Sequence, residues 1–349
     1  MERSVTIGKR DSERMMLKQI VYLAHWIVAL DTATFFPFLD YAQKKSRRTK
    51  VGLVLDSLYS VLKYRISIIE YFQFEFFLKS TDQRSTYIGT PLLEEYQLKM
   101  NPKSERHYLH NKLEFLKVYA PFIKHRHAAL DDLLANNEAA AKVLLNKSGK
   151  IVLKSIFGEG GNRIEIISAE DQDAQSMIKR LAASGNDFVE EFVVQHRDLM
   201  RLAPSGLNTL RIVTQLNSND EVEILGATLR ISVASTVDNW HKGNIAAPVD
   251  LSAGIVEGPG FYMDITKHDE YIHPITGVEI VGFKIPFWQE SAQLAKNAAS
   301  SNKKNRSIGW DIAITDDGPD LIEGNHNWDK VIWQRSAGKG LKPLIEAYF

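Results

Sequence analysis

The stretch that decides the fold is IGWDIAITDDGPDLIEGN, residues 308–325. Two apolar runs flank the turn sequence Asp-Asp-Gly-Pro-Asp, which is typical of a β-hairpin. Side chains alternate between the two faces of a strand, so Glu323 and Asn325 share one face. With the hairpin centred near Gly318, we expect Asp311 to lie opposite Asn325 and diagonal to Glu323.

Three oxygen-bearing side chains would then converge inside an otherwise apolar hairpin. Two carboxylates at that separation repel each other and resist burial, and a divalent cation relieves both problems. Mg²⁺ binds few carboxylates and leaves positions for phosphates, so the candidate magnesium ligands are Asp311, Glu323 and Asn325. The alternative is an exposed acidic hairpin without a metal, and we expect that simpler state for Asp316, Asp317 and Asp320.

A glycine-rich stretch, KIVLKSIFGEGGNRIEII, occupies residues 150–167. It predicts a strand, a loop and a second strand, because a β-like run rather than a helix follows the loop. Walker A and dinucleotide-binding loops both open a helix, so neither pattern applies. Lys154 would place an ammonium against a phosphate under this flap, where backbone N–H groups approach an anion closely at Gly158, Gly160 and Gly161. A plain glycine-rich hairpin is the alternative.

The two halves of the chain differ in texture. Residues 1 to about 90 repeat apolar side chains at helical spacing, with a break expected at Pro37. From about residue 145, short β-like runs alternate with glycines and few helical patterns separate them, which favours antiparallel strands over a doubly wound parallel sheet. The predicted fold class is therefore α+β, and Gly89-Thr90-Pro91 marks the end of the N-terminal helical region.

The composition excludes several classes of protein. The 349 residues contain 43 Lys and Arg, 43 Asp and Glu, and no Cys. Zero net charge gives no overall attraction to nucleic acid, and the missing cysteines exclude thiolate nucleophiles and Cys-ligated metals. No apolar stretch reaches the roughly 20 residues of a transmembrane helix. Without a recognisable signal peptide, the expected compartment is the cytoplasm; the sequence does not predict an oligomeric state.

Two features of the N-terminal region are open to two interpretations. A dense aromatic cluster is interpreted as a buried helix–helix contact, with a peripheral membrane or partner-docking surface as the alternative. Its members are Tyr71, Phe72, Phe74, Phe76 and Phe77. The basic run KKSRRTK, residues 44–50, is interpreted as a solvated loop, with phosphate or glycan binding as the alternative.

Together with the flap and the acidic hairpin, the order and spacing of further segments resemble the ATP-grasp superfamily. Within it, the chain looks most like the sugar-transfer-associated ATP-grasp branch, and the resemblance covers roughly residues 90–349. The segments that carry it are VLKSIFGEGGNR (152–163), FVEEFVVQH (188–196), LNTLRIVT (207–214), DNWHKGNIAAPVDLSAGIV (238–256), HPITG (273–277) and GWDIAITDDGPDLIEGN (309–325).

The resemblance implies ATP held between two α+β subdomains, with Mg²⁺ as the metal. Residues 1–90 are then an N-terminal helical region and 91–349 an ATP-grasp domain. Within that domain, 91–150 form the first subdomain or linker, 151–195 the nucleotide-binding flap, and 196–349 the metal and substrate subdomain.

The same resemblance implies roles for individual residues. Lys154 and Lys112 look like the family's phosphate-binding lysines. Adenine and ribose would meet Glu190, Glu191 and Val193, and the transferring group would meet Arg211, Lys242 and Asn244. Asp311, Glu323 and Asn325 match the family's magnesium ligands. For Arg211, an ion pair with a neighbouring strand is the alternative.

The function that the resemblance implies is an ATP-dependent carboxylate–amine ligase. It would form an amide through an acyl phosphate, from a small-molecule carboxylate and an amine, in a setting such as surface-polysaccharide or peptide biosynthesis. A small-molecule kinase and a non-catalytic nucleotide-binding module are the alternatives. The aromatic insertion at 256–288 is expected to line the pocket for the non-nucleotide substrate, with His273 as a candidate contact.

Overall fold

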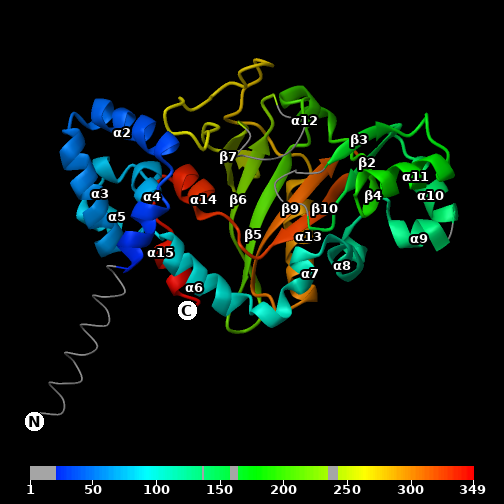
Figure 1. Ribbon diagram of the computed structural model, residues 1–349, viewed down its shortest axis with the longest axis horizontal. Helices are drawn as coiled ribbons and strands as arrows, with labels where there is room; N and C mark the ends of the chain where they lie inside the picture. Colours follow the sequence, from blue (N-terminus) through cyan, green and yellow to red (C-terminus); the bar gives the residue numbers. More distant parts are fainter. Residues whose placement is uncertain (1–20, 136, 158–163, 235–242) are drawn as a thin grey trace, which may run out of the picture. The chain divides into compact units, whose positions relative to one another are not determined.

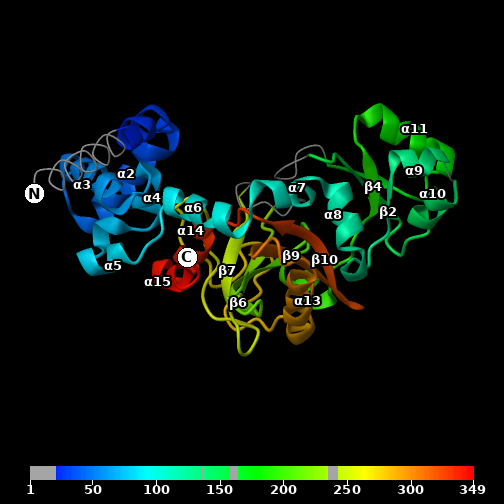
Figure 2. The ribbon, with the colours of Figure 1, turned by 90° about the horizontal axis from the view of Figure 1, so that it is seen from below.

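The computed structural model describes residues 21–135, 137–157, 164–234 and 243–349, and these fall into two compact units (Figures 1 and 2). The first unit combines the N-terminal part of the chain up to Tyr96 with the segments Asp264–His268 and Asp329–Phe349. The second unit combines Gln97–Met263 with Asp269–Trp328. The bounds 1–90 and 91–349 for the two domains stay a prediction.

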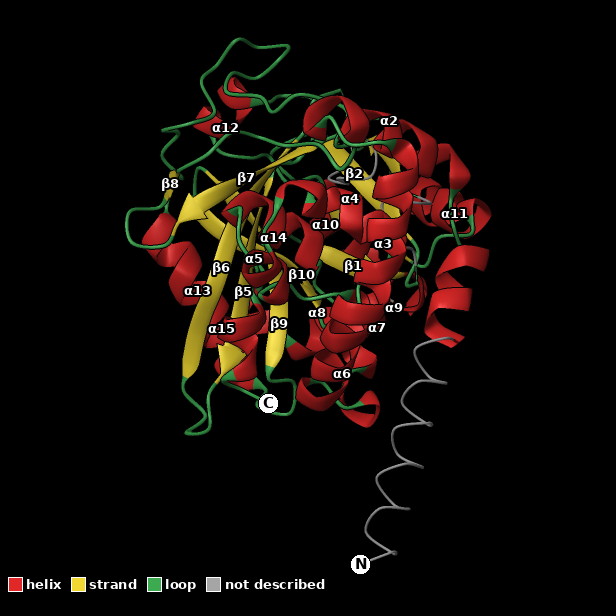
Figure 3. Cartoon of the chain, turned by 90° about the vertical axis from the view of Figure 1, so that its left-hand side faces the viewer, coloured by secondary structure: helices red, strands yellow, loops and turns green. Residues whose placement is uncertain are grey.

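The first unit is helical, as its apolar periodicity predicts. Figure 3 shows α2, α3 and α4 side by side. Ser, Thr or Asp side chains accept a backbone N–H at the N-termini of α2 to α5. The helices are α2 (Thr32–Ser46), α3 (Lys50–Tyr64), α4 (Ile68–Gln73), η1 (Phe76–Leu78), α5 (Thr81–Ser85), the first part of α6 (Thr90–Met100), α14 (Lys330–Ala337) and α15 (Lys342–Glu346).

The aromatic cluster forms the core of this unit. All five of its side chains are buried, and the rings of Tyr71 and Phe72 meet edge to face with centroids 5.0 Å apart. The interpretation as a buried contact is confirmed, so this cluster is not a docking surface.

The break predicted at Pro37 is wrong. Asp31 accepts the N–H of Ala33 and begins a new helix, so Pro37 lies in the second turn of α2 and removes one backbone hydrogen bond there. In the described part of the chain, no single helix has the length and hydropathy of a membrane span. The helical segment Val21–Val28 and helix α2 have that length and hydropathy only when they are taken together, and the two are bent by 99° relative to each other.

The second unit contains two antiparallel sheets, which confirms the predicted α+β class. One sheet has the strand order β1-β4-β2-β3. Its strands are β1 (His127–Ala129), β2 (Lys150–Lys154), β3 (Glu165–Ser168) and β4 (Phe188–Glu191), accompanied by helices α9 (Leu130–Ala135), α10 (Asn137–Leu144) and α11 (Ala174–Ser184). Since β2 pairs directly with β3, the predicted hairpin on either side of the glycine-rich loop is confirmed. The glycines Gly158, Gly160 and Gly161 lie outside the described residues.

The second sheet has the strand order β10-β9-β5-β6-β7-β8. Helix α13 (Trp288–Ser301) packs against four of its strands, β5, β6, β9 and β10. Figure 2 shows the helix below β9 and β10. The strands are β5 (Thr209–Leu216), β6 (Val222–Ile231), β7 (Ile245–Asp250), β8 (Ile255–Val256), β9 (Ser307–Thr315) and β10 (Gly318–Asn325). Shorter helices of the unit are η2 (Lys103–Glu105), α7 (His107–His110), α8 (Lys112–Val118), η3 (Ala120–Phe122) and α12 (Arg197–Leu202).

The hairpin β9–β10 is present, but its predicted register is wrong. The strands pair from Thr315 and Gly318, so the turn is centred on Asp316-Asp317 instead of Gly318, whose φ of +100° suits glycine. A register shift between Leu321 and Glu323 then makes a β-bulge at Ile322. As a result Asp311 lies directly opposite Glu323, and Asn325 lies opposite Gly309.

Candidate active site

A pocket of about 50 Å³ in the second unit brings several of the predicted site residues together. Four of its lining side chains are polar and were predicted from the sequence: Lys112, Lys154, Glu190 and Glu323. The other four are apolar and were not predicted: Leu109, Phe115, Leu116 and Ile322. The pocket therefore combines two lysines and two carboxylates with an apolar wall, a usual composition for a small-molecule site.

Local structure places the two lysines at the pocket. Asn111 accepts the N–H of Glu114 and caps α8, while the Lys112 N–H donates to the carbonyl of Ile156. The chain just after Lys154 is fixed by Asp187, which accepts the Ile156 N–H at 2.8 Å. Lys112 and Lys154 thus approach the pocket from α8 and from the end of β2.

Lys154 pairs with Glu190 across β2 and β4. Val152 is the residue opposite Glu190, so Lys154 and Glu190 are diagonal neighbours on one face of the sheet, and their side chains form an ion pair. The second oxygen of Glu190, Oε1, lies 3.5 Å from Nε2 of the buried His125.

Sequence reasoning missed His125 and misjudged its other partner, Asp320. The predicted exposure of Asp320 is wrong, because the turn ends at Gly318 and Asp320 is a buried residue of β10. Its carboxylate accepts the N–H of Lys124 at 2.7 Å and of His125 at 3.0 Å, and lies 2.8 Å from His125 Nδ1. Asp316 and Asp317 are exposed, as expected.

The four side chains form a row of alternating charge. Burial by itself lowers the pKa of His125, but hydrogen bonds with Asp320 and Glu190 outweigh it and raise the pKa to about 10. Burial by itself raises the pKa of Glu190, but Lys154 and His125 outweigh it and hold this pKa below its usual range. At neutral pH, His125 is therefore positively charged and Glu190 negatively charged, and the two lie between their ion-pair partners Asp320 and Lys154.

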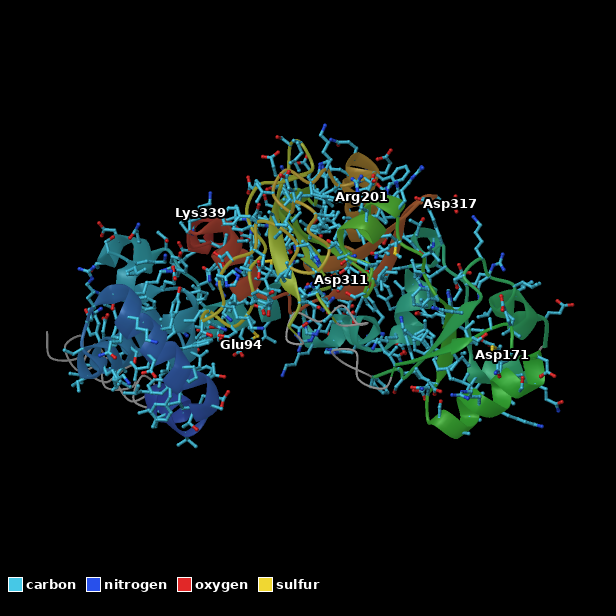
Figure 4. All side chains as sticks on the ribbon, turned by 90° about the horizontal axis from the view of Figure 1, so that it is seen from above. Glu94, Asp171, Arg201, Asp311, Asp317 and Lys339 are labelled. Carbon is cyan, nitrogen blue, oxygen red and sulfur yellow. The ribbon has the colours of Figure 1, made fainter. Side chains whose placement is uncertain are left out.

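A second charged group surrounds Asp311, which Figure 4 labels in the sheet. Arg211 lies directly opposite Asp311 on β5 and binds both of its carboxylate oxygens, with Nη2–Oδ2 at 2.7 Å. Oδ2 also lies 3.4 Å from Nη1 of Arg230 and accepts the Nδ2–H of Asn325 at 3.3 Å. Burial raises the pKa of Asp311, but the two arginines outweigh it and lower the pKa. Arg211 thus forms the ion pair between strands that the sequence left as its alternative.

Glu323 completes this group from the opposite strand. Burial and the charge of Asp311 raise its pKa, against the opposing influence of Lys112, Arg211 and Lys154. Within the described residues, no cluster of three His, Asp or Glu side chains could hold a metal ion. Two carboxylates and the amide oxygen of Asn325 are nevertheless hard oxygen donors, and the repelled carboxyl of Glu323 is one that a divalent cation would stabilise. The residues present therefore fit a magnesium ion that also binds phosphates.

The remaining predicted residues lie elsewhere. Glu191 is half-buried, with its Oε2 3.8 Å from Nε of Arg126, and Val193 follows the end of β4. Asn244 is buried just before β7, and its Oδ1 accepts the N–H of Val233 at 3.1 Å. Lys242 lies outside the described residues.

The expected substrate contact by His273 is wrong. This side chain is buried, and its Nε2 lies 2.9 Å from the carbonyl oxygen of Ser232. Its Nδ1 accepts the N–H groups of Ile275 and Thr276. Nε2 therefore ties the 273–277 loop to the end of β6, while Nδ1 fixes the turn within the loop itself.

Comparisons with solved structures return synthetases and ligases at low similarity. The ADP complex of an N5-carboxyaminoimidazole ribonucleotide synthetase is 11% identical, with a TM-score of 0.39 over 64% of this chain and 46% of that one. The D-cycloserine synthetase DcsG is 13% identical, with a TM-score of 0.42 over 71% of each chain. An L-amino acid ligase from Bacillus licheniformis is 12% identical, with a TM-score of 0.37 over 65% of this chain and 42% of that one. The chain thus spans less than half the length of the first and third of these proteins.

No curated protein sequence matches the chain. The family model described as sugar-transfer associated ATP-grasp, in contrast, matches residues 92–348, which is most of the sequence. That segment contains both sheets, the pocket and the Arg211–Asp311 pair. The chain belongs to the sugar-transfer associated ATP-grasp family.

Proposed function

We propose that this protein is an ATP-dependent ligase that joins a carboxylate to an amine. A carboxylate oxygen of the substrate attacks the γ-phosphorus of ATP, and ADP leaves. The amine nitrogen then attacks the acyl carbon, phosphate leaves, and the nitrogen loses a proton. The chain has no cysteine, so the proposal places the activated acyl group on phosphate and not on a thiol of the protein.

The observation that carries this proposal is the meeting of Lys112, Lys154 and Glu323 in one pocket, with Asp311 opposite Glu323. Phosphoryl transfer depends on fixed cations that stabilise charge spreading over the phosphate oxygens. Lys112 and Lys154 supply such cations from two separate elements, α8 and β2. Glu190 and His125 hold the Lys154 ammonium in place, because they form the row of charges behind it.

Asp311, Glu323 and Asn325 are the residues that would hold Mg²⁺, which when bound neutralises phosphate charge. Asp311 stays ionised because Arg211 and Arg230 lower its pKa, so it offers a permanent negative charge. Arg211, which is held by Asp311, is proposed to contact the transferring group. Lys242 and Asn244 are proposed to contact that same group.

Glu190, Glu191 and Val193 are proposed to meet adenine and ribose, with Gly158, Gly160 and Gly161 as the flap over the phosphates. The Glu190 side chain is engaged by Lys154 and His125, so its share in binding the base would come from the backbone. We place the reaction in the cytoplasm, where ATP is available.

The test is transfer of oxygen isotope from substrate to phosphate. The protein is incubated with Mg-ATP, a pool of ¹⁸O-carboxylates and a pool of amines, and the released phosphate is analysed by mass spectrometry. The proposal predicts ¹⁸O in the phosphate and an amide product. ADP release with no ¹⁸O in phosphate would replace the ligase with a kinase, and no ADP release would leave a nucleotide-binding module.

A pair of variants separates the site from general instability. Glu323→Gln is expected to abolish ADP release, since it removes a proposed metal ligand. Asp317 lies in the same hairpin, and its side chain is exposed. Asp317→Asn is therefore expected to leave ADP release unchanged.

A further inference from the structure

Helix α3 carries two apolar faces of different kinds. The face turned to the core of the first unit consists of Leu53, Ser57, Ser60 and Val61. The other face, here called the outer α3 face, consists of Val51, Val54, Leu55, Leu58, Tyr59 and Leu62. Val51, Leu55 and Tyr59, four residues apart, are 70%, 61% and 52% exposed. The helix thus buries two serines beside Leu53 and Val61, while it leaves three large apolar residues exposed on the opposite side.

This distribution is the reverse of that on an ordinary surface helix. On α13 the exposed positions are all polar: Gln289, Glu290, Gln293, Asn297, Ser300 and Ser301. Scattered exposed apolar residues need no explanation, but a row of three on successive turns of one helix marks a surface that contacts something apolar. Folding of the first unit accounts for the half-buried Val54, Leu58 and Leu62. It does not account for Val51, Leu55 and Tyr59, which stay exposed.

The segment that contains this face carries mostly positive charges, and carboxylates from outside the segment pair with Lys45, Lys50 and Arg65. Residues 44–65 contain seven Lys and Arg and one acidic residue, Asp56. Asp56 is only partly exposed and is occupied by Arg48, Arg84 and the hydroxyl of Tyr71. Lys44, Arg47 and Lys50 lie at the N-terminal end of α3, and Lys63 and Arg65 at its C-terminal end.

The ends of α3 can present these cations to a surface. The Lys63 ammonium lies 5.3 Å from the centroid of the Tyr59 ring, beside the outer α3 face. Lys50 pairs with Asp40, and Arg65 pairs with Glu95, but all four side chains are about half exposed. Such exposed pairs are worth little, so their cations exchange readily for other anions.

An apolar helix face with cations at both ends matches a lipid surface that displays negative headgroups. A second copy of the chain matches less well, because antiparallel α3 helices would set Lys50 of one copy near Lys63 and Arg65 of the other. Residues 1–20, which lie outside the described part, carry five Lys and Arg against three Asp and Glu, so their net charge is positive as well.

We propose that the outer α3 face docks this protein on an anionic lipid surface, with α3 lying in the plane of the headgroups. Val51, Leu55 and Tyr59 enter the apolar boundary, and Lys44, Arg47, Lys50, Lys63 and Arg65 contact lipid phosphates. The aromatic cluster at residues 71–77, which the sequence offered as a membrane surface, stays in the core and supports α3 from behind.

The experiment is co-sedimentation of the full chain with phosphatidylcholine vesicles, with and without phosphatidylglycerol. The wild-type protein is expected to bind the vesicles that contain phosphatidylglycerol and to be released by high salt. In the triple variant Val51→Gln, Leu55→Gln and Tyr59→Gln, glutamine preserves helix propensity, and binding is expected to fall by about tenfold or more. Circular dichroism and ATP turnover should be unchanged.

The matched control is Leu134→Gln with Leu145→Gln. These two leucines of the second unit are 66% and 75% exposed, so the double variant removes comparable apolar surface elsewhere, and it should bind vesicles like wild type. The proposal is overturned if wild type does not bind, or if the α3 triple variant binds as well as the control. It is also overturned if light scattering finds a dimer that the triple variant abolishes while vesicle binding is unaffected.

Discussion

Asp320→Asn tests the row of charges behind the candidate active site. Asp320 accepts the N–H groups of Lys124 and His125 and lies 2.8 Å from His125 Nδ1, with only 2% of its surface exposed. Asparagine has nearly the same size and keeps one acceptor oxygen. The substitution therefore removes the negative charge while the space stays filled.

The size of the effect follows from this burial. Removing one partner of a buried ion pair costs about 3–5 kcal/mol, because an uncompensated charge is left behind. The rise in the His125 pKa from 6.5 to about 10 corresponds to an upper limit of roughly 5 kcal/mol. Glu190, 3.5 Å from His125, still compensates part of the charge in the variant. We expect the free energy of unfolding to fall by about 3 kcal/mol at neutral pH.

The pH dependence separates loss of charge from loss of packing. Because the folded-state pKa of His125 is raised, its stabilising contribution is complete below about pH 6.5 and disappears as the pH rises toward 10. In Asp320→Asn the folded-state pKa of His125 is lower, so the free energy of unfolding of the variant falls less over this pH range. The stabilities of wild type and variant should therefore converge as the pH approaches 10.

The assay is urea unfolding at pH 6.5 and at pH 10, followed by circular dichroism. Asp317→Asn is the control, because its pair with Lys147 is fully exposed and is expected to contribute little to stability. Two results would refute the reasoning. One is an Asp320→Asn cost no larger than that of Asp317→Asn, and the other is a cost that does not change between the two pH values.

Three further predictions concern other parts of the fold. Glu323→Gln should leave the free energy of unfolding unchanged or slightly higher, since it removes repulsion from Asp311. Mg²⁺-dependent ATP turnover should fall by about 100-fold or more. A loss of turnover that is accompanied by a loss of stability would contradict this. Lys330→Met should cost the first unit about 3–5 kcal/mol in urea unfolding, because the buried Glu70 loses its ion pair at 2.7 Å, whereas Lys342→Met breaks only an exposed pair with Glu346 and should cost less than about 1 kcal/mol. Gly254→Ala should lower the melting temperature more than Gly185→Ala: both glycines have positive φ, but a Cβ at 254 would meet Trp288 at 2.2 Å, and one at 185 has open space.

The parts of the fold that sequence predicts well are those with local signals. Glycine punctuation and apolar runs predict the β2–β3 hairpin, and the Asp-Asp-Gly turn predicts β9–β10, because each involves residues close together in the chain. The helical periodicity of the N-terminal region is equally local. Pro37 was misjudged because a proline early in a helix removes a hydrogen bond without ending it, and Asp31 begins α2 six residues earlier.

Contacts between distant segments could not be predicted in this way. Asp320 lies 195 residues from His125, and nothing near either residue indicates the other. A carboxylate beside a turn is usually solvated, so its burial depends on a partner that only the folded chain supplies. The sequence left open whether Arg211 contacts the transferring group or forms an ion pair with a neighbouring strand, because its partner Asp311 is 100 residues away.

Asp311 and Glu323, the two carboxylates of the candidate metal site, meet because a β-bulge at Ile322 interrupts the regular pairing of β9 and β10. Without the bulge, the register that starts at Thr315 and Gly318 would pair Asp311 with Ile322 and would turn Glu323 to the other face of the sheet. The extra residue at Ile322 turns Glu323 back to the face of Asp311, where burial and like charge raise its pKa. No residue type marks this bulge in the sequence, because Ile322 is an ordinary strand former. The carboxylates predicted from the hairpin therefore meet through a different geometry from the one their spacing suggested, and their repulsion is offset by Arg211, Lys112 and Lys154 around them.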